Sequence, residues 1–247
     1  MIDIHSHILW GLDDGAQTLD DSIGMLRLAA EGGTTEIVAT PHANNRYRYD
    51  EAIVAERIRE VAGATAGLPK IHRGCEVHLT FDNLQETVAR PSSYSINGGP
   101  YVLVEFPGAS LRGMAQALQT LIDRGLIPIM AHPERQPELQ RINSDFLGWI
   151  EMGCLAQITG QSLLGRFGKT AEESAWEMLR RGFAHFVASD AHGLRDRTPR
   201  LDEPFSAVVG RCGRETAESL FTRNPEAVVT GQRIQGGAPK KRPWYRL

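Results

Sequence analysis

The 247-residue sequence contains only three cysteines, which are widely separated: Cys75, Cys154 and Cys212. Three dispersed cysteines do not form a disulfide scaffold and fit buried thiols in a reducing compartment. The sequence lacks an apolar run of the ~18 residues that a membrane span needs. Its first residues, MIDIHSHI, lack the basic and apolar regions of a signal peptide. We therefore expect a cytoplasmic protein without a transmembrane segment.

A strong net charge is also absent, since 27 Lys and Arg residues face 30 Asp and Glu residues and leave a formal charge of -3. Such a balance indicates no general affinity for nucleic acid. Hydrophobic residues make up 41% of the chain, which is typical of a globular protein that can bury a large core without disulfides. A monomer and a homo-oligomer both remain open.

Short apolar runs alternate with longer segments of helical periodicity. The predicted strands lie at residues 2–5, 36–40, 70–75, 101–106, 127–131, 155–158 and 184–189. The predicted helices lie at residues 19–31, 50–62, 111–124, 144–152, 170–181, 204–212 and 215–222. Residues 77–100 are expected to form a long connection. This alternation predicts an α/β protein built from parallel βα units.

The C-terminal segment differs from the rest. Residues 232–247 contain five basic and no acidic residues, with glycine and proline breaks. We predict one domain over residues 1–230, followed by a basic and loosely ordered tail over residues 231–247. The alternative is that the tail contacts a membrane surface, a partner or a neighbouring subunit, with Trp244 as its apolar anchor.

Histidines and carboxylates follow six of the seven predicted strands. The nine candidate metal ligands are His5, His7, Asp14, His42, Glu76, Glu105, His132, Asp190 and His192. The carboxyl ends of parallel strands meet at one rim of a barrel, where barrel enzymes carry their sites. The sequence therefore predicts a metal centre at this rim. His72, His78 and His185 are not at rim positions and are interpreted as packing or surface residues, although His78 could line the pocket.

The candidate ligands offer nitrogen and oxygen but no thiolate. This chemistry favours manganese, iron, magnesium or zinc over copper(I), without choosing among the four. Arg135 and Arg197 follow His132 and His192 on the same rim loops. A guanidinium group matches phosphate oxygens in a two-point contact, so both arginines are predicted to bind a substrate phosphate. The common alternative for each arginine is a surface ion pair.

Several strings together resemble a known family. They are MIDIHSHI at 1–8, DDG at 13–15, LVEF at 103–106, AHPER at 131–135, ASDAH at 188–192 and NPEAV at 224–228. They resemble the polymerase and histidinol phosphatase (PHP) superfamily and, more narrowly, its bacterial capsule-type protein tyrosine phosphatases. The resemblance covers about residues 1–230. It implies a distorted (β/α)7 TIM-like barrel, the PHP fold, holding three divalent metal ions, with manganese as the first expectation.

The resemblance also implies roles for individual residues. His5, His7, Glu76 and Asp190 would bind one ion; Glu76 would bridge to a second, held also by Glu105 and His132; and Asp14, His42 and His192 would hold the third. A hydroxide bridging the metals would attack phosphorus in line, and Arg135 would stabilise the charge of the transition state. Arg197 matches another phosphate-contacting position.

A cysteine-dependent phosphatase needs an arginine six positions after its cysteine. Those positions hold Phe81, Gly160 and Glu218, which excludes that mechanism. The favoured interpretation is a metal-dependent phosphotyrosine-protein phosphatase that acts on a bacterial tyrosine kinase controlling capsular or exopolysaccharide synthesis. The alternatives are a small-molecule phosphatase such as histidinol-phosphatase, a nuclease of the same superfamily and a catalytically silent scaffold. A deep closed cavity would favour the small-molecule phosphatase.

Overall fold

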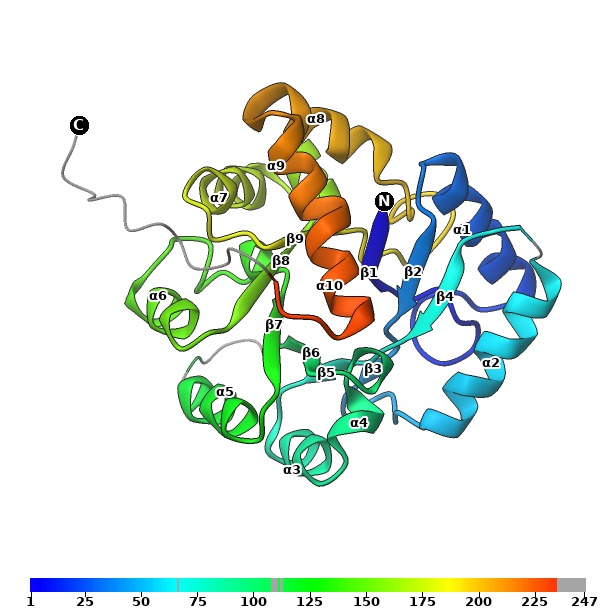
Figure 1. The fold of residues 1–247 in the computed structure, drawn as a ribbon, viewed down its shortest axis with the longest axis horizontal. Coiled ribbons are helices and arrows are strands. Elements are labelled where there is room, and N and C mark those ends of the chain that lie inside the picture. Colours follow the sequence, from blue (N-terminus) through cyan, green and yellow to red (C-terminus); the bar gives the residue numbers. More distant parts are fainter. Residues whose placement is uncertain (66, 108–110, 112, 235–247) are drawn as a thin grey trace.

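Parallel strands form the centre of the protein and helices surround them (Figure 1). The computed structural model describes residues 1–65, 67–107, 111 and 113–234. The strands are β1 (Ile2–Ser6), β2 (Glu36–Ala39), β3 (His42–Ala43), β4 (Lys70–Arg73), β5 (Glu76–His78), β6 (Tyr101–Glu105), β7 (Ile127–Ala131), β8 (Leu155–Thr159) and β9 (Phe186–Ala188). Every pairing between them is parallel, which confirms the predicted α/β class.

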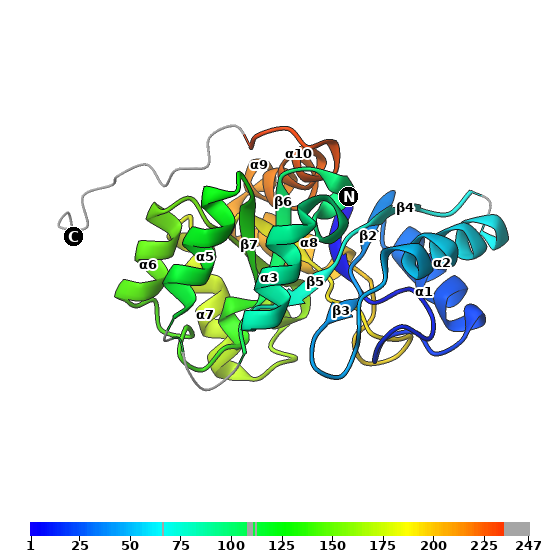
Figure 2. The same cartoon turned by 90° about the horizontal axis from the view of Figure 1, so that it is seen from below.

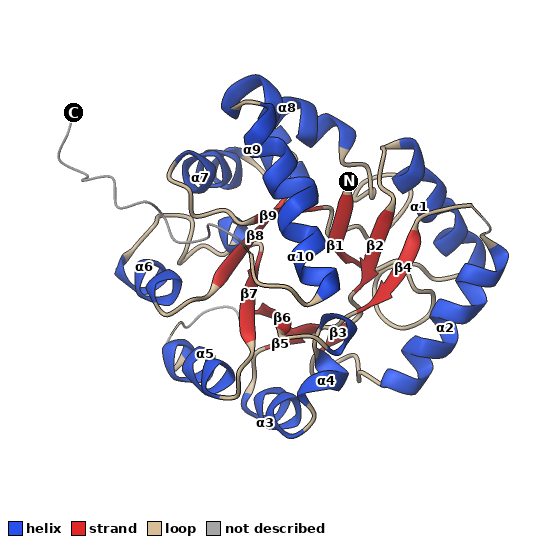
Figure 3. Cartoon of the chain, in the orientation of Figure 1, coloured by secondary structure: helices blue, strands red, loops and turns tan. Residues whose placement is uncertain are grey.

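Helices follow most of the strands and cover the outside of the sheets (Figure 3). They are α1 (Leu19–Glu31), α2 (Glu51–Ala64), α3 (Phe81–Ala89), α4 (Pro91–Tyr94), α5 (Met114–Asp123), α6 (Ser144–Glu151), α7 (Lys169–Arg180), α8 (Asp202–Cys212), α9 (Arg214–Glu218) and α10 (Asn224–Thr230). Short 3-10 turns add η1 (Ile96–Gly98), η2 (Pro133–Arg135) and η3 (Gly160–Leu164), and the π-helical turn η4 (Ser219–Arg223) joins α9 to α10. No helix within the described ranges is long and apolar enough to cross a membrane.

The strands form two sheets, with orders β1-β2-β4 and β3-β5-β6-β7-β8-β9. The predicted strand at 36–40 matches β2, which ends at Ala39, and the chain then enters the second sheet as β3. The predicted strand at 70–75 was too long, because β4 ends at Arg73 and the chain resumes in the second sheet as β5. Pro41 has no N–H for a ladder hydrogen bond, which accounts for the break between β2 and β3. Hydrogen bonds still cross the interruptions, from Gly74 N to Ala39 O (2.9 Å) and from Glu76 N to Pro41 O (3.1 Å).

The far edge of the six-stranded sheet also meets β1. Ser6 forms an isolated parallel bridge with Ala191, which follows β9. The backbone N–H of Asp190 donates to His5 O at 2.8 Å, and the backbone N–H of His7 donates to Ala191 O at 2.9 Å. Contacts of this kind bring the ends of β1 and β9 together at the position where the predicted metal ligands lie.

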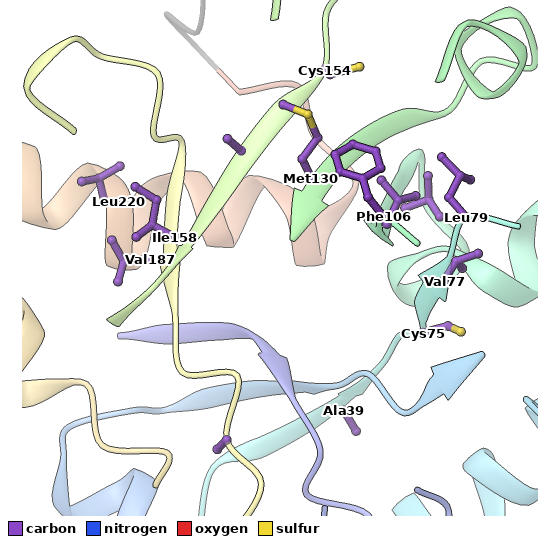
Figure 4. Close-up of a cluster of buried hydrophobic side chains, with 14 of the residues drawn as sticks. Ala39, Cys75, Val77, Leu79, Phe106, Met130, Cys154, Ile158, Val187 and Leu220 are labelled. Carbon is purple, nitrogen blue, oxygen red and sulfur yellow. The ribbon is translucent and has the colours of Figure 1, made fainter. Parts of the chain in front are cut away.

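Alternation along the strands divides the core into two hydrophobic clusters. In β6, Val102 and Val104 belong to the cluster beneath the outer helices, whereas Tyr101 and Leu103 belong to the inner cluster. Glu105 follows in the inner register, because side chains two residues apart point to the same face. Figure 4 shows part of the outer cluster, including Met130.

Helix α10 packs against β1 and contributes Val228 and Val229 to the inner cluster. Figure 2 shows α9 and α10 at one end of the strands and the long loop after β3 at the opposite end. The helix therefore covers the amino-terminal end of the strands, and the carboxyl-terminal end is left to the loops that carry the candidate ligands.

Helix α1 agrees with its predicted bounds. Thr18 caps it and Asp21 completes a reciprocal capping box, as the spacing predicts. Other bounds differ: α5 begins three residues later than predicted, the last predicted helix continues through η4 and α10, and the connection at 77–100 contains α3 and α4.

Only the start of the predicted tail can be compared with the structure. Tyr101 donates its hydroxyl to Gln232 O at 2.7 Å, and Ile234 N donates to that hydroxyl at 3.2 Å. The first residues after 230 are therefore attached to β6 rather than loose. The rest of the predicted tail, 235–247 with Trp244, lies outside the described residues.

Candidate metal centre

All nine predicted ligands gather at the carboxyl-terminal ends of the strands. Groups whose ligand atoms lie within 4.8 Å of one another are His7–Asp14–His42–His192, His5–His132–Asp190, His5–His7–Glu76 and His42–Glu76–Glu105. Residues more than 180 positions apart meet here, since the end of β1 adjoins the end of β9. His72 lies outside these groups, and its Nε2 is 2.6 Å from Oε2 of Glu36.

Glu76 lies at the middle of the cluster and is fully buried. Its Oε1 is 3.0 Å from Nε2 of His132 and 3.3 Å from Nε2 of His5. Its Oε2 is 3.0 Å from Nδ1 of His42 and 3.4 Å from Nε2 of His7. A carboxylate with imidazole nitrogens beside both of its oxygens fits a group that binds metal cations.

Asp190 forms the second buried acid of the cluster. Its Oδ1 is 3.3 Å from Nε2 of His5, 3.5 Å from Nε2 of His7 and 3.6 Å from Nδ1 of His192. Within the described part of the chain, Asp190 Oδ1 and Glu76 Oε2 are buried atoms without a hydrogen-bond donor. Leaving such oxygens unpaired is costly, and their position among imidazole nitrogens fits ligation of divalent cations.

The remaining acidic ligands lie nearer to solvent. Asp14 Oδ1 is 3.4 Å from Nε2 of His42 and 3.5 Å from Nε2 of His192, and the Asp14 side chain is 49% exposed. Glu105 Oε1 is 3.8 Å from Nε2 of His132. The site is thus open on the side of Asp14, which does not match a deep closed cavity.

Three histidines are oriented through their Nδ1 atoms. Nδ1 of His5 is 2.8 Å from Oε1 of Gln157, and Nδ1 of His7 is 2.7 Å from Oδ2 of Asp13. Nδ1 of His192 is 3.0 Å from the backbone oxygen of Asp190. When Nδ1 donates to these acceptors, the lone pair of the neutral ring is on Nε2, which points into the cluster. The residues therefore fit a metal centre in tautomer as well as in composition.

The acids and histidines of the cluster shift one another's pKa values. Burial raises the pKa of Glu76, but the nearby His5, His132 and His42 outweigh burial and hold that pKa well below its usual value. Burial lowers the pKa of His42, yet its contacts with Asp14 and Glu76 exceed that effect and raise the pKa to about 10. Without cations, Asp14 and Glu76 thus favour the protonated form of His42, and a bound cation would take the place of that proton.

The backbone of the site departs from ordinary geometry at two ligands. His132 and Asp190 have φ angles of 34° and 50°, in the left-handed region that few residues other than glycine adopt. His132 directly follows β7 and Asp190 lies two residues after the end of β9. Such conformations concentrate at functional sites because packing must hold them in place. Here they turn the side chains of His132 and Asp190 toward Glu76 and His5.

A glycine brings the loop of Asp14 against β1. A Cβ atom on Gly15 would stand 2.1 Å from His7 O and 2.4 Å from His7 Cβ. Gly15 N donates to Oδ1 of Asp13 at 2.9 Å, and Ala16 N donates to His7 O at 3.1 Å. Only glycine allows the approach that places Asp13 and Asp14 beside the histidines.

The two predicted phosphate-binding arginines converge on one atom. Nη1 of Arg135 and Nη2 of Arg197 both donate to Oδ2 of Asp190. Their side chains are 24% and 29% exposed, so the remaining guanidinium N–H groups lie at the edge of the cluster. Nε of Arg197 is buried without a partner among the described residues. The arginines thus present unused donors beside the candidate ligands.

The chain is similar to known proteins over almost its whole length. Residues 1–230 match the family described as capsular polysaccharide synthesis, CpsB/CapC. The chain belongs to this family. It is 35% identical to the tyrosine-protein phosphatase YwqE of Bacillus subtilis (strain 168), over 98% of this chain and 97% of YwqE. It is 31% identical to the tyrosine-protein phosphatase CpsB of Streptococcus pneumoniae, over 95% of this chain and 100% of CpsB.

Solved structures agree with the CpsB/CapC assignment. One comes from a description of crystal structures of YwqE from Bacillus subtilis and CpsB from Streptococcus pneumoniae, which it calls metal-dependent tyrosine phosphatases. It matches with a TM-score of 0.89 and 34% identity, over 98% of this chain and 100% of that chain. A β-aspartyl dipeptidase from Fervidobacterium islandicum has a TM-score of 0.58 at 15% identity, and shares the fold alone.

The sequence prediction for this CpsB/CapC protein missed two site residues. Asp13 and Gln157 are buried and orient His7 and His5, although neither was among the predicted ligands. The signal for Asp13 was present, because histidines that bind metal commonly need a carboxylate on their second nitrogen. His78 also contacts the site, with Nδ1 3.2 Å from Oε2 of Glu105.

Proposed function

We propose that this protein is a metal-dependent tyrosine-protein phosphatase that serves capsular or exopolysaccharide synthesis. The observation that carries the proposal is the convergence of nine nitrogen and oxygen ligands beside two arginines, in a chain of the CpsB/CapC family. Hydrolysis would break the bond between phosphorus and the phenolic oxygen, with water as the acceptor, and would release tyrosine and phosphate. The open side at Asp14 suits a phosphorylated side chain carried on a protein.

The arginines would bind the phosphate oxygens. Arg135 and Arg197 each use one N–H group on Asp190 and keep other donors for a dianionic ester. The positive charge of both guanidinium groups would also stabilise the negative charge that spreads over the equatorial oxygens in the transition state. Divalent ions held by these residues would supply Lewis-acid chemistry at the phosphoryl oxygens and would lower the pKa of bound water.

For the metals, we propose three divalent ions, with manganese as the first choice and iron, magnesium or zinc as alternatives. The proposed ligand sets are those that the family resemblance implies: His5, His7, Glu76 and Asp190; Glu76, Glu105 and His132; and Asp14, His42 and His192. The central position of Glu76 supports its role as the ligand shared by the first two sets.

We also propose a barrel architecture, a domain extent, a location and a substrate for this protein. The bridge between Ser6 and Ala191, with the hydrogen bonds across Gly74 and Glu76, supports a distorted seven-stranded (β/α)7 barrel in which the two sheets are one ring. We propose a single domain over residues 1–230, a cytoplasmic location and a bacterial tyrosine kinase as the phosphorylated substrate.

The test is phosphate release from a phosphotyrosine peptide and from histidinol phosphate, with manganese-loaded protein. We expect turnover of the peptide that is abolished by a chelator and by His42→Ala, and reduced by roughly 100-fold or more in Arg135→Ala. Arg211→Ala removes an arginine that stacks on Trp176 away from the site, and serves as the matched control. Turnover of histidinol phosphate alone would overturn the phosphotyrosine assignment. A His42→Ala variant that kept its activity would overturn the role of His42 in the metal site.

A further inference from the structure

An aromatic side chain outside the ligand set contacts both phosphate-binding arginines. Cζ of Arg135 lies 4.3 Å from the centre of the Phe167 ring, and Cζ of Arg197 lies 5.9 Å from it. The same two guanidinium groups donate to Asp190. Each arginine is therefore held from two sides, by a carboxylate within the site and by an aromatic ring at its edge.

The loop that carries Phe167 is tied to the turn that carries Arg135. Glu134, the neighbour of Arg135, is buried, and its Oε1 accepts hydrogen bonds from Ser162 Oγ at 2.7 Å and from Thr159 N at 3.0 Å. Ser162 lies in η3, which directly precedes the loop with Phe167. The distance between Phe167 and Arg135 is thus set by buried hydrogen bonds and not by the ring contact alone.

We propose that Phe167 is a positioning residue that holds Arg135 and Arg197 in the orientation that binds phosphate. The inference rests on the proposed function, since it concerns the phosphate subsite of that reaction. A long arginine side chain loses rotamer freedom when it binds an anion, and holding it beforehand removes part of that cost. The attraction between a guanidinium group and an aromatic face supplies the restraint that an aliphatic side chain of similar size lacks.

The decisive variant is Phe167→Leu, which keeps an apolar side chain but removes the aromatic face. We expect the affinity for inorganic phosphate, measured by calorimetry on manganese-loaded protein, to fall about 3- to 30-fold. kcat/KM for a phosphotyrosine peptide should fall by at least the same factor, because the arginines also bind the transition state. Phe167→Trp keeps the aromatic face and should stay within about 3-fold of the wild type.

The neighbouring Arg166 offers a matched control. Arg166 forms an exposed ion pair with Glu203 at 3.0 Å, so Arg166→Ala changes the same loop without touching the arginine contacts. Phosphate affinity unchanged in Phe167→Leu, or reduced equally in Arg166→Ala, would overturn the proposal. Thermal unfolding of each variant separates a loss of folding from a loss of positioning. Because calorimetry needs no turnover, wild-type protein that binds phosphate but hydrolyses no phosphotyrosine would refute the proposed function and leave Phe167 testable.

Discussion

The histidines of the metal centre depend on acceptors for their outward-facing ring nitrogens. Asp13 shows this dependence most clearly, because its carboxylate accepts from the Gly15 N–H and the His42 N–H and also contacts Nδ1 of His7. One buried side chain thus orients two candidate ligands and the loop that brings Asp14 to the site. Substitution of Asp13 should therefore weaken the centre without removing a ligand.

We predict that Asp13→Asn lowers the affinity for manganese by 10- to 100-fold, as expected for loss of a carboxylate that orients a ligating histidine. The asparagine has the same shape but only one acceptor oxygen, so it cannot satisfy His7 and Gly15 together. Calorimetric titration of the metal-free protein measures the affinity. Asp20→Asn, an exposed change in α1, is the control. Equal affinities in Asp13→Asn and wild type would contradict the proposed orienting role.

Gly15 offers a second prediction at the scale of one residue. In Gly15→Ala the new methyl group would lie 2.1 Å from His7 O, so either His7 or the loop with Asp14 must move. We expect at least a 10-fold loss of phosphatase activity, because small displacements of catalytic groups are costly. Gly63→Ala, whose Cβ meets nothing within 4 Å in α2, should leave activity unchanged. Full activity in Gly15→Ala would show that the loop can shift freely.

At the scale of the element, α1 is stabilised at its first turn by the capping box. The Thr18 hydroxyl pairs with Asp21, and this contact lowers the pKa of Asp21 below 3.8. A carboxylate whose pKa is lowered on folding contributes stability above its unfolded pKa, and the contribution is lost as the pH falls through the folded value. The cap should therefore matter at neutral pH and fade in acid.

We predict that Thr18→Ala costs about 1 kcal/mol of unfolding free energy at neutral pH. The difference from wild type should shrink as the pH falls from 3.8 through the lower pKa of Asp21 in the folded wild type, because Asp21 is protonated in both proteins below that value. Urea unfolding of both proteins at several pH values measures it. A difference that stays constant in acid would show that the hydroxyl acts without the carboxylate.

One of the helices that sequence reasoning missed is α3. Its segment offers few buried apolar residues, with only Thr87 buried, and Phe81 at its start is 75% exposed. Periodicity is a weak signal for such a helix, because its hydrophobic stripe is sparse. The cap was readable, since Thr80 accepts from Asn83 N at 3.3 Å. The glycine, serine and proline residues further on favoured a loop interpretation for the whole segment.

For the whole molecule, the ligand cluster couples metal binding to stability. Cations that bind the folded chain stabilise it by mass action, by about 2.7 kcal/mol at a free concentration of 100 Kd. We predict that a chelator lowers the melting temperature of the wild type, and that Glu76→Gln loses most of the increase that manganese produces. Glu76 contacts four histidines, so its replacement should weaken metal binding across the cluster.

Differential scanning calorimetry with and without manganese measures this prediction. The comparison uses the increase in melting temperature that manganese produces within each protein, because the substitution also changes the buried charge of the metal-free form. Glu36→Gln affects a carboxylate that pairs with His72 away from the site and provides the control. An equal increase in Glu76→Gln and wild type would contradict a metal centre built around Glu76.

The sequence alone was sufficient for the parallel α/β class, the capping box of α1 and the nine side chains that gather at the strand ends. Strand periodicity and the residue that follows a strand are local properties, so they can be read without knowing which strands are neighbours. The parallel arrangement then carries every carboxyl-terminal strand end to one side, which is why the cluster could be predicted before its distances were known.

Only the tertiary structure decided which groups hold these ligands. Gln157 reaches His5 from 152 positions away, and Arg135 reaches Asp190 from 55. The position of the Phe167 ring beside two arginines has the same origin. These contacts depend on how layers of side chains pack across the sheets, and no periodicity along the chain encodes that packing.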